Sequence, residues 1–170
     1  MSSIKVALAG ATGNLGISVL KALLTANLRV TVLSRIGGNS SKLTPHPNLT
    51  ILEVDFNSTQ SLIAALQGTE VVISCLATLA IGNQNPLIDA SIAAGVRRFV
   101  PTEFGMDSRN PLCISLTVCV PKADTQKYLQ EKINSNENLS YTCIVQRIIS
   151  RLGSQSGLHH QPSPTHCNTV

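Results

Sequence analysis

The sequence predicts an α/β fold, a doubly wound and mostly parallel sheet of about six strands with helices on both faces. Short apolar runs alternate with segments whose apolar residues recur at helical spacing. Such alternation is typical of parallel strands joined by right-handed helical crossovers. Aromatic residues make up only 3% of the 170 residues. The core is therefore expected to consist of Leu, Ile, Val and Ala, as in sheets covered on both faces.

The first strand–helix–strand unit is predicted at the N-terminus. The run IKVALA at 4–9 is short, apolar and followed by glycine, which indicates a strand. Apolar residues at helical spacing predict a helix over 14–26, and the run RVTVLS predicts a second strand at 29–34.

The same alternation continues to residue 145. The remaining elements are predicted as a strand at 49–56, a helix at 58–68, a strand at 70–77, a helix at 85–95, a strand at 97–104, a helix at 122–133 and a strand at 139–145. Ser58 is suited to cap the second helix, and Gly68 and Gly95 are suited to end helices. After Val145 the periodicity stops. Residues 146–170, rich in Ser, Gln, His and Pro, are expected to form a disordered or irregular tail.

Composition and charge argue against several classes of partner. The net charge is +4, and the basic residues are scattered without interleaved aromatic residues, so we do not expect nucleic-acid binding. No apolar run approaches the ~18 residues of a membrane span, and no leader segment is recognisable. The five cysteines have no framework-like spacing, which favours reduced thiols and a cytoplasmic protein.

Three glycines stand where the first predicted strand meets the first predicted helix, in the string GATGNLG. Gly10 would permit a tight turn, Gly13 would let the main chain approach a pyrophosphate, and Gly16 would let the helix pack closely. The helix N-terminus would bind the phosphates. The spacing differs from G-x-G-x-x-G, and a purely structural turn is the alternative. The residues expected to bind a dinucleotide are Gly10, Ala11, Thr12, Gly13, Asn14, Leu15 and Gly16. Residues 1–145 thus form a predicted NAD(P)-binding, Rossmann-like domain.

The end of the second predicted strand indicates which dinucleotide is bound. A carboxylate at this corner would suit the ribose 2′-hydroxyl of NAD, whereas arginine suits a 2′-phosphate. Ser34 and Arg35 stand here, and the guanidinium can pair with phosphate oxygens through two hydrogen bonds. The position therefore favours NADP(H), with a solvated surface arginine as the alternative.

Lys122 is the candidate for proton transfer. Pro121 fixes the start of the helix at 122–133, so Lys122 lies in its first turn, at the sheet edge where a cofactor would bind. A lysine in that place can act as a general acid or base. The alternative is an ordinary exposed lysine.

Ser115, Tyr128 and Lys132 reproduce the S-x12-Y-x3-K spacing of the short-chain dehydrogenase triad. However, Tyr128 stands six residues after Lys122, roughly 9 Å along the helix. It also shares an apolar stripe with Leu129 and Ile133, which favours packing against the sheet.

No metal site is expected from the histidines of the C-terminal segment. They have no partner ligands at a fixed spacing, so a solvated segment is the favoured interpretation. These histidines are His159, His160 and His166.

Three strings resemble the NmrA-like / isoflavone reductase-like family of atypical short-chain dehydrogenases/reductases over about residues 3–145. They are GATGNLG, AAGVRRFVPTEFGMD and PKADTQKYL. The resemblance implies that the glycine loop, Arg35 and Lys42 hold NADPH. It also implies that Lys122 is the catalytic lysine and that Gln126, four positions on, helps to arrange the cofactor site.

The resemblance implies an NADPH-dependent reductase acting on a small organic, secondary-metabolite substrate. Family members continue after the sixth strand into a region that forms much of the substrate pocket, whereas this chain reads QRIISRLG there. Without that wall the substrate would be poorly oriented and exposed to water. Two alternatives stay open. One is an inactive, truncated reductase, and the other is a non-catalytic NAD(P)-binding regulator of the NmrA type with a protein partner.

Overall fold

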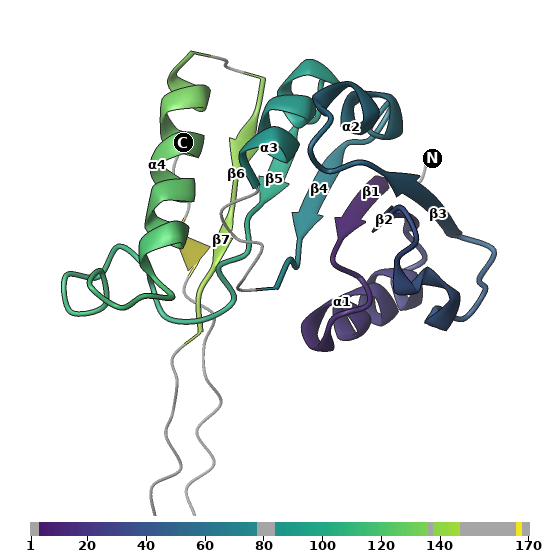
Figure 1. Ribbon diagram of the computed structural model, residues 1–170, viewed down its shortest axis with the longest axis horizontal. Coiled ribbons are helices and arrows are strands. Elements are labelled where there is room, and N and C mark those ends of the chain that lie inside the picture. Colours follow the sequence, from purple (N-terminus) through teal and green to yellow (C-terminus); the bar gives the residue numbers. More distant parts are fainter. Residues whose placement is uncertain (1–3, 78–83, 136–137, 147–165, 168–170) are drawn as a thin grey trace, which may run out of the picture.

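The structure is a computed structural model that describes residues 4–77, 84–135, 138–146 and 166–167. Figure 1 shows one open sheet with helices on either side. Its six strands lie in the order β3-β2-β1-β4-β5-β6, and every neighbouring pair is parallel. The strands are β1 (Lys5–Ala9), β2 (Arg29–Arg35), β3 (Leu49–Val54), β4 (Val71–Ser74), β5 (Arg98–Val100) and β6 (Ser140–Tyr141). The predicted α/β fold class, a doubly wound sheet, is confirmed.

Helices connect successive strands as the periodicity predicts. They are α1 (Asn14–Thr25), α2 (Thr59–Ala65), α3 (Gln84–Ala93) and α4 (Val120–Asn134), with a short 3-10 helix η1 (Asn39–Lys42) between β2 and β3. Ser58 caps α2 as expected, because its hydroxyl accepts a hydrogen bond from the Ser61 amide. Gly95 follows α3 with a positive φ of 73°, a conformation that glycine adopts without strain.

The two faces of the sheet are covered unequally. On one face α2, α3 and α4 pack their apolar side chains against the sheet, and on the other α1 packs over the middle strands. Leu62, Phe99 and Leu129 are fully buried in the larger cluster. Leu20 of α1 covers Leu8 and Val32 in the smaller one. Aliphatic residues make up most of both clusters, as the composition predicts.

The strand order reverses between β1 and β4, which are neighbours in the sheet. On the two sides of this point, α1 packs against one face of the sheet, and α3 and α4 pack against the other. In open α/β sheets, ligands bind at the carboxyl edge beside such a reversal. Figure 1 shows β1 and β4 pointing toward the bottom of the view, where the loops before α1 and α4 both lie.

Several predicted strands are shorter in the structure. The strand predicted at 49–56 ends at Val54, and the strand predicted at 70–77 is Val71–Ser74. The strand predicted at 97–104 ends at Val100, because the chain turns at Pro101, which has no amide hydrogen to donate. With β5 ending there, the strand predicted at 139–145 divides into β6 and β7 (Cys143–Ile144). β7 pairs antiparallel with β8 (His166–Cys167). The rest of the predicted C-terminal tail lies almost wholly outside the described residues.

Candidate functional site

Two of the three loop glycines are required by the packing of the protein itself. Gly10 has a positive φ of 81°, and a Cβ there would lie less than 3.0 Å from the backbone of Cys75, just after β4. A Cβ on Gly16 would come equally close to the Gly10 carbonyl oxygen. Real Cβ atoms essentially never show such contacts. Gly10 therefore lets the turn after β1 pass close to the chain after β4, and Gly16 lets α1 pack closely on that turn.

Gly13 differs from the other two glycines. Its φ of −78° suits any residue, and the nearest atom to an added Cβ would be the Gly10 carbonyl oxygen at 3.4 Å, an ordinary contact. The fold therefore has room for a side chain at Gly13. Packing within the protein does not explain this glycine, and the approach of a ligand to its main chain stays a prediction.

The N-terminus of α1 is open to solvent. Residues 12–15 are exposed, and no side chain caps the helix, whose N-cap residue is Gly13. The first-turn amides of a helix have no acceptor within the helix itself, and they carry its positive dipole end. These features fit a pyrophosphate, so the residues present suit the dinucleotide predicted for this loop.

Arg35 lies beside the glycine loop. β1 and β2 pair in parallel with Ala9 level with Leu33, so Arg35 stands two residues beyond that level at the same edge. Its carbonyl accepts hydrogen bonds from the Gly38 amide (2.8 Å) and the Ser34 hydroxyl (3.3 Å), which fix the backbone. Its side chain is exposed, as is that of Lys42 at the end of η1. Both remain predicted cofactor ligands.

Lys122 meets the turn that follows β5. It lies in the first turn of α4, directly after Pro121, as predicted. Its half-buried Nζ donates a hydrogen bond to the Glu103 carbonyl oxygen at 2.5 Å. A Cβ on Gly105 would lie 3.7 Å from the same Nζ. The structure thus brings Lys122 to the carboxyl edge of the sheet and holds its ammonium group against the main chain.

Glu103 is a functional candidate that sequence reasoning missed. Its side chain is 1% exposed, and its Oε1 accepts a hydrogen bond from the Ser108 hydroxyl at 3.1 Å. Burial raises the pKa of the Glu103 carboxyl, while hydrogen bonds from Gln126 and Ser108 and the charge of Lys122 oppose that rise. The available signal was a carboxylate near the end of the predicted strand RRFVPTEF.

Gln126 belongs to the same buried group. It is 3% exposed, and its Nε2 donates to the Ser108 hydroxyl at 2.8 Å. The side chain thus lies within the protein beside Lys122 and Glu103. The cofactor contact predicted for Gln126 stays a prediction.

The structure does not assemble the triad suggested by the spacing of Ser115, Tyr128 and Lys132. The Tyr128 hydroxyl donates to Asp89 of α3, and Lys132 forms an ion pair with the same carboxylate. Burial, and then Asp89, raise the pKa of Tyr128. Ser115 is exposed in the segment before α4. Tyr128 therefore packs between helices, although it faces α3 more than the sheet.

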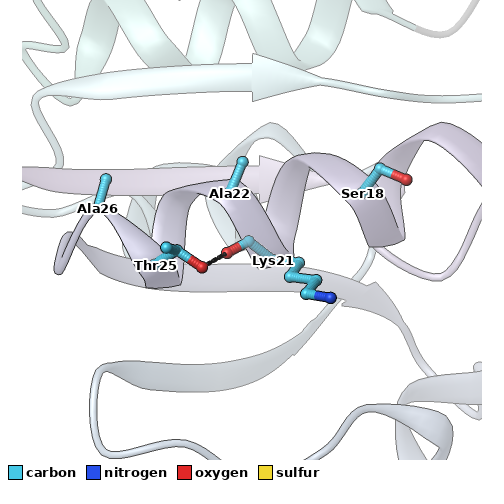
Figure 2. A pocket seen from close by; sticks show the side chains of 5 residues that line it. All are labelled: Ser18, Lys21, Ala22, Thr25 and Ala26. Carbon is cyan, nitrogen blue, oxygen red and sulfur yellow. Dashed lines mark hydrogen bonds between the residues drawn. The ribbon is translucent and has the colours of Figure 1, made fainter.

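A surface hollow on α1 contains none of these groups. Figure 2 shows Ser18, Lys21, Ala22, Thr25 and Ala26 along its wall, with Thr25 donating to the Lys21 carbonyl. Within the described ranges, no helix is long and apolar enough to cross a membrane, and no cluster of ligating side chains could hold a metal ion. His159 and His160 lie outside those ranges.

Known proteins are similar to this chain in sequence and in fold. Oxidoreductase aprR of Aspergillus flavus is 37% identical over 147 residues, which is 84% of this chain and 48% of that protein. The isoflavone reductase homolog IRL of Zea mays is 35% identical, over 61% of this chain and 36% of that protein. This chain thus spans about half the length, or less, of these curated relatives.

Solved structures of reductases are similar to this chain in fold. AtPrR2 with NADP+ and (+)pinoresinol matches 85% of this chain and 50% of that chain with a TM-score of 0.69 and 26% identity. The leucoanthocyanidin reductase–NADPH complex from Vitis vinifera covers 83% of this chain and 49% of that one, with a TM-score of 0.67 and 24% identity, which shows the shared fold. The model of the NmrA-like family matches residues 2–151. Since this match covers most of the sequence, the chain belongs to the NmrA-like family, and its isoflavone reductase-like resemblance is confirmed.

Proposed function

We propose that this chain binds NADP(H) and serves the reduction of a small organic substrate of secondary metabolism. The observation that carries the proposal is the contrast among the loop glycines. Gly10 and Gly16 are required by packing, whereas Gly13 has space for a side chain and stands at an uncapped helix N-terminus. A ligand that needs bare main chain at this point accounts for the third glycine.

Arg35 supports the choice of NADP(H) over NAD(H). Its side chain is exposed beside the glycine loop, and its backbone is held by the Gly38 amide. A guanidinium there can form two hydrogen bonds to a 2′-phosphate. Lys42, exposed on η1, would add a second positive charge. NADP+ and NADPH are also present in the solved structures named above.

Lys122 would transfer the proton in the reaction. The reduced nicotinamide supplies the hydride when it is bound. One N–H of the Lys122 ammonium group donates to the Glu103 carbonyl oxygen, and this hydrogen bond fixes the position of Nζ. An ammonium group has two further donors, one of which can bond and protonate a substrate oxygen.

Cofactor binding is the first test of the proposal. Titration of the folded protein with NADPH and NADH should show tighter binding of NADPH. Arg35→Ala should weaken NADPH binding by about tenfold or more, the loss expected for a charged hydrogen bond, and leave NADH binding unchanged. Arg97→Ala removes a positive charge from an exposed residue before β5 and should change neither affinity. Equal losses for both coenzymes with Arg35→Ala would contradict the NADP(H) assignment.

A second candidate function is a non-catalytic NAD(P)-binding regulator that recognises a protein partner. The observation that favours it is a row of exposed apolar side chains just before and at the start of α4. Groups of exposed apolar side chains are typical of interaction surfaces. The row consists of Leu112, Ile114, Leu116, Val118 and Val120.

Turnover separates the two candidates. NADPH oxidation would be followed with a panel of enones, lactones and phenylpropanoid lignans. A reductase should oxidise NADPH with at least one of them, and Lys122→Ala should lose that turnover while still binding NADPH. A regulator should show no substrate-dependent oxidation in either protein.

A further inference from the structure

The turn after β5 buries a carboxyl group for which the proposed reaction has no direct use. Of the charged side chains in the described ranges, only that of Glu103 is buried, at 1% exposure. Taking a carboxyl out of water costs free energy unless hydrogen bonds compensate for the lost hydration, so a buried carboxyl is expected to have a role. The neighbours of Glu103 indicate what this role is.

The backbone around Glu103 is tightly turned and strained. The Glu103 amide donates to the Pro101 carbonyl two residues earlier, at 2.8 Å. The next residue, Phe104, has a positive φ of 33°, which is unusual for a residue with a large side chain. Such a conformation persists only where the surrounding contacts hold it. The turn therefore needs anchors.

The side chain of Glu103 supplies an anchor to α4. Its Oε1 accepts from the Ser108 hydroxyl, and the same hydroxyl accepts from Gln126 of α4. The backbone of Glu103 meets α4 a second time, because its carbonyl accepts from Lys122 Nζ. Gln126 and Lys122 are one helical turn apart, so one residue contacts α4 through its carboxyl and its carbonyl.

We propose that Glu103 is a positioning residue for Lys122. Its buried carboxyl, linked to α4 through Ser108 and Gln126, fixes the strained turn so that the Glu103 carbonyl holds the Lys122 ammonium group in place. The inference rests on the proposed role of Lys122 in proton transfer. It assigns Glu103 no contact with substrate or cofactor.

The neutral form of the carboxyl suits this role best. Glu103 Oε2 and Gln126 Oε1 are buried acceptors that have no hydrogen-bond partner. A protonated carboxyl brings a donor to this group of buried acceptors, and the raised pKa of Glu103 agrees with this form. The charged groups that face the carboxyl are Lys122 of α4, which favours ionisation, and Asp107 of the same loop, which opposes it. An amide at position 103 has both a donor and an acceptor and should replace the acid.

Two substitutions test the proposal. Glu103→Gln keeps the size and the hydrogen bonds of the neutral acid, whereas Glu103→Ala removes them. In protein without cofactor, a hydrogen-bonded Lys122 ammonium group should give a slowly exchanging 1H–15N signal, assigned by its loss in Lys122→Arg. We expect the signal in the wild type and in Glu103→Gln, and its loss in Glu103→Ala. In turnover, Glu103→Ala should lower kcat by about tenfold or more, with the KM for NADPH changed less than about twofold.

The outcomes test the proposal whether or not the protein turns over a substrate. An unchanged Lys122 signal in Glu103→Ala would overturn the proposal. Equal loss in Glu103→Gln would overturn the neutral form of this anchor, because a charge would then be the essential property. If Glu103→Ala does not fold, Ser108→Ala removes the bridge and keeps the carboxyl, and it must weaken the Lys122 signal. If neither the wild type nor any variant reduces a substrate, the proposed function fails. The Lys122 signal still shows whether Glu103 positions the Lys122 ammonium group.

Discussion

The Tyr128 hydroxyl lies 2.8 Å from each carboxylate oxygen of Asp89, and this contact joins α4 to α3. Lys132 Nζ is 2.8 Å from the same carboxylate and 4.9 Å from the centre of the Tyr128 ring. The catalytic tyrosine of a Ser–Tyr–Lys triad needs a lowered pKa, whereas burial and Asp89 raise the pKa of Tyr128. Tyr128 is thus a structural residue.

Tyr128→Phe should accordingly leave catalysis intact. We expect NADPH affinity and any kcat to stay within about twofold of the wild type. The free energy of unfolding should fall by about 1 kcal/mol through loss of the hydrogen bond to Asp89. Urea unfolding and NADPH oxidation measure the two effects. Loss of turnover with unchanged stability would instead support the triad.

Substitutions of the loop glycines should affect stability and NADPH binding separately. Gly16→Ala places a Cβ less than 3.0 Å from the Gly10 carbonyl, so we expect it to lower the free energy of unfolding by about 2 kcal/mol or more. Gly13→Ala has room and a permissive φ, so its stability should change by less than about 1 kcal/mol. Its NADPH affinity should nevertheless fall by about tenfold, because the methyl group would meet the pyrophosphate.

Urea unfolding and NADPH titration of both variants provide the measurement, and each variant is the control for the other. A Gly13→Ala protein that binds NADPH as tightly as the wild type would show that this glycine does not serve ligand approach. A Gly16→Ala protein of wild-type stability would contradict the close packing of α1 on the loop.

The cysteines should differ in reactivity. Burial raises the pKa of the Cys75 thiol to about 11, so almost none of it is thiolate at neutral pH. Cys113 is partly exposed. Iodoacetamide labelling followed by peptide mapping should therefore modify Cys113 much faster than Cys75 in folded protein. In urea the two rates should become similar. Fast native labelling of Cys75 would indicate that the junction of β4 with the glycine loop opens.

Local sequence signals predicted the fold well because they act over a few residues. Ser58 caps the helix that follows it, and the string GATGNLG runs from the turn after β1 into the start of α1, as expected. The position of Lys122 in the first turn of α4 followed from Pro121. These features depend on hydrogen bonds and dihedral angles within one turn of chain.

The parts that sequence reasoning missed depend on contacts between distant segments. Gln126 reaches Ser108 across 18 residues, and Tyr128 reaches Asp89 across 39. Neither pairing has a periodic signature, because it arises only when α3, α4 and the turn after β5 pack together. The division of the last predicted strand also followed from a neighbour, since the pairing of β6 with β5 ends at Phe99 and Tyr141.

The raised pKa of Glu103 makes stability depend on pH in a specific direction. An acid whose pKa is higher in the folded state binds more protons there than in the unfolded chain. Stability therefore falls as the pH rises from the ordinary value of 4.5 to the folded value, and it changes no further above that window. Below 4.5 the carboxyl is protonated in both states, and its contribution is constant.

Glu103→Gln isolates this contribution, because the amide does not titrate while the other ionisable groups remain. The free energy of unfolding of the wild type minus that of Glu103→Gln should decrease as the pH rises above 4.5 and then level off. Urea unfolding at several pH values from 4 to about 8 gives this difference, with Glu131→Gln, an exposed residue of α4, as the matched control. A difference that increases with pH would mean that Lys122 stabilises the carboxylate more than burial opposes it. The anchor of the turn would then be an ion rather than the neutral acid.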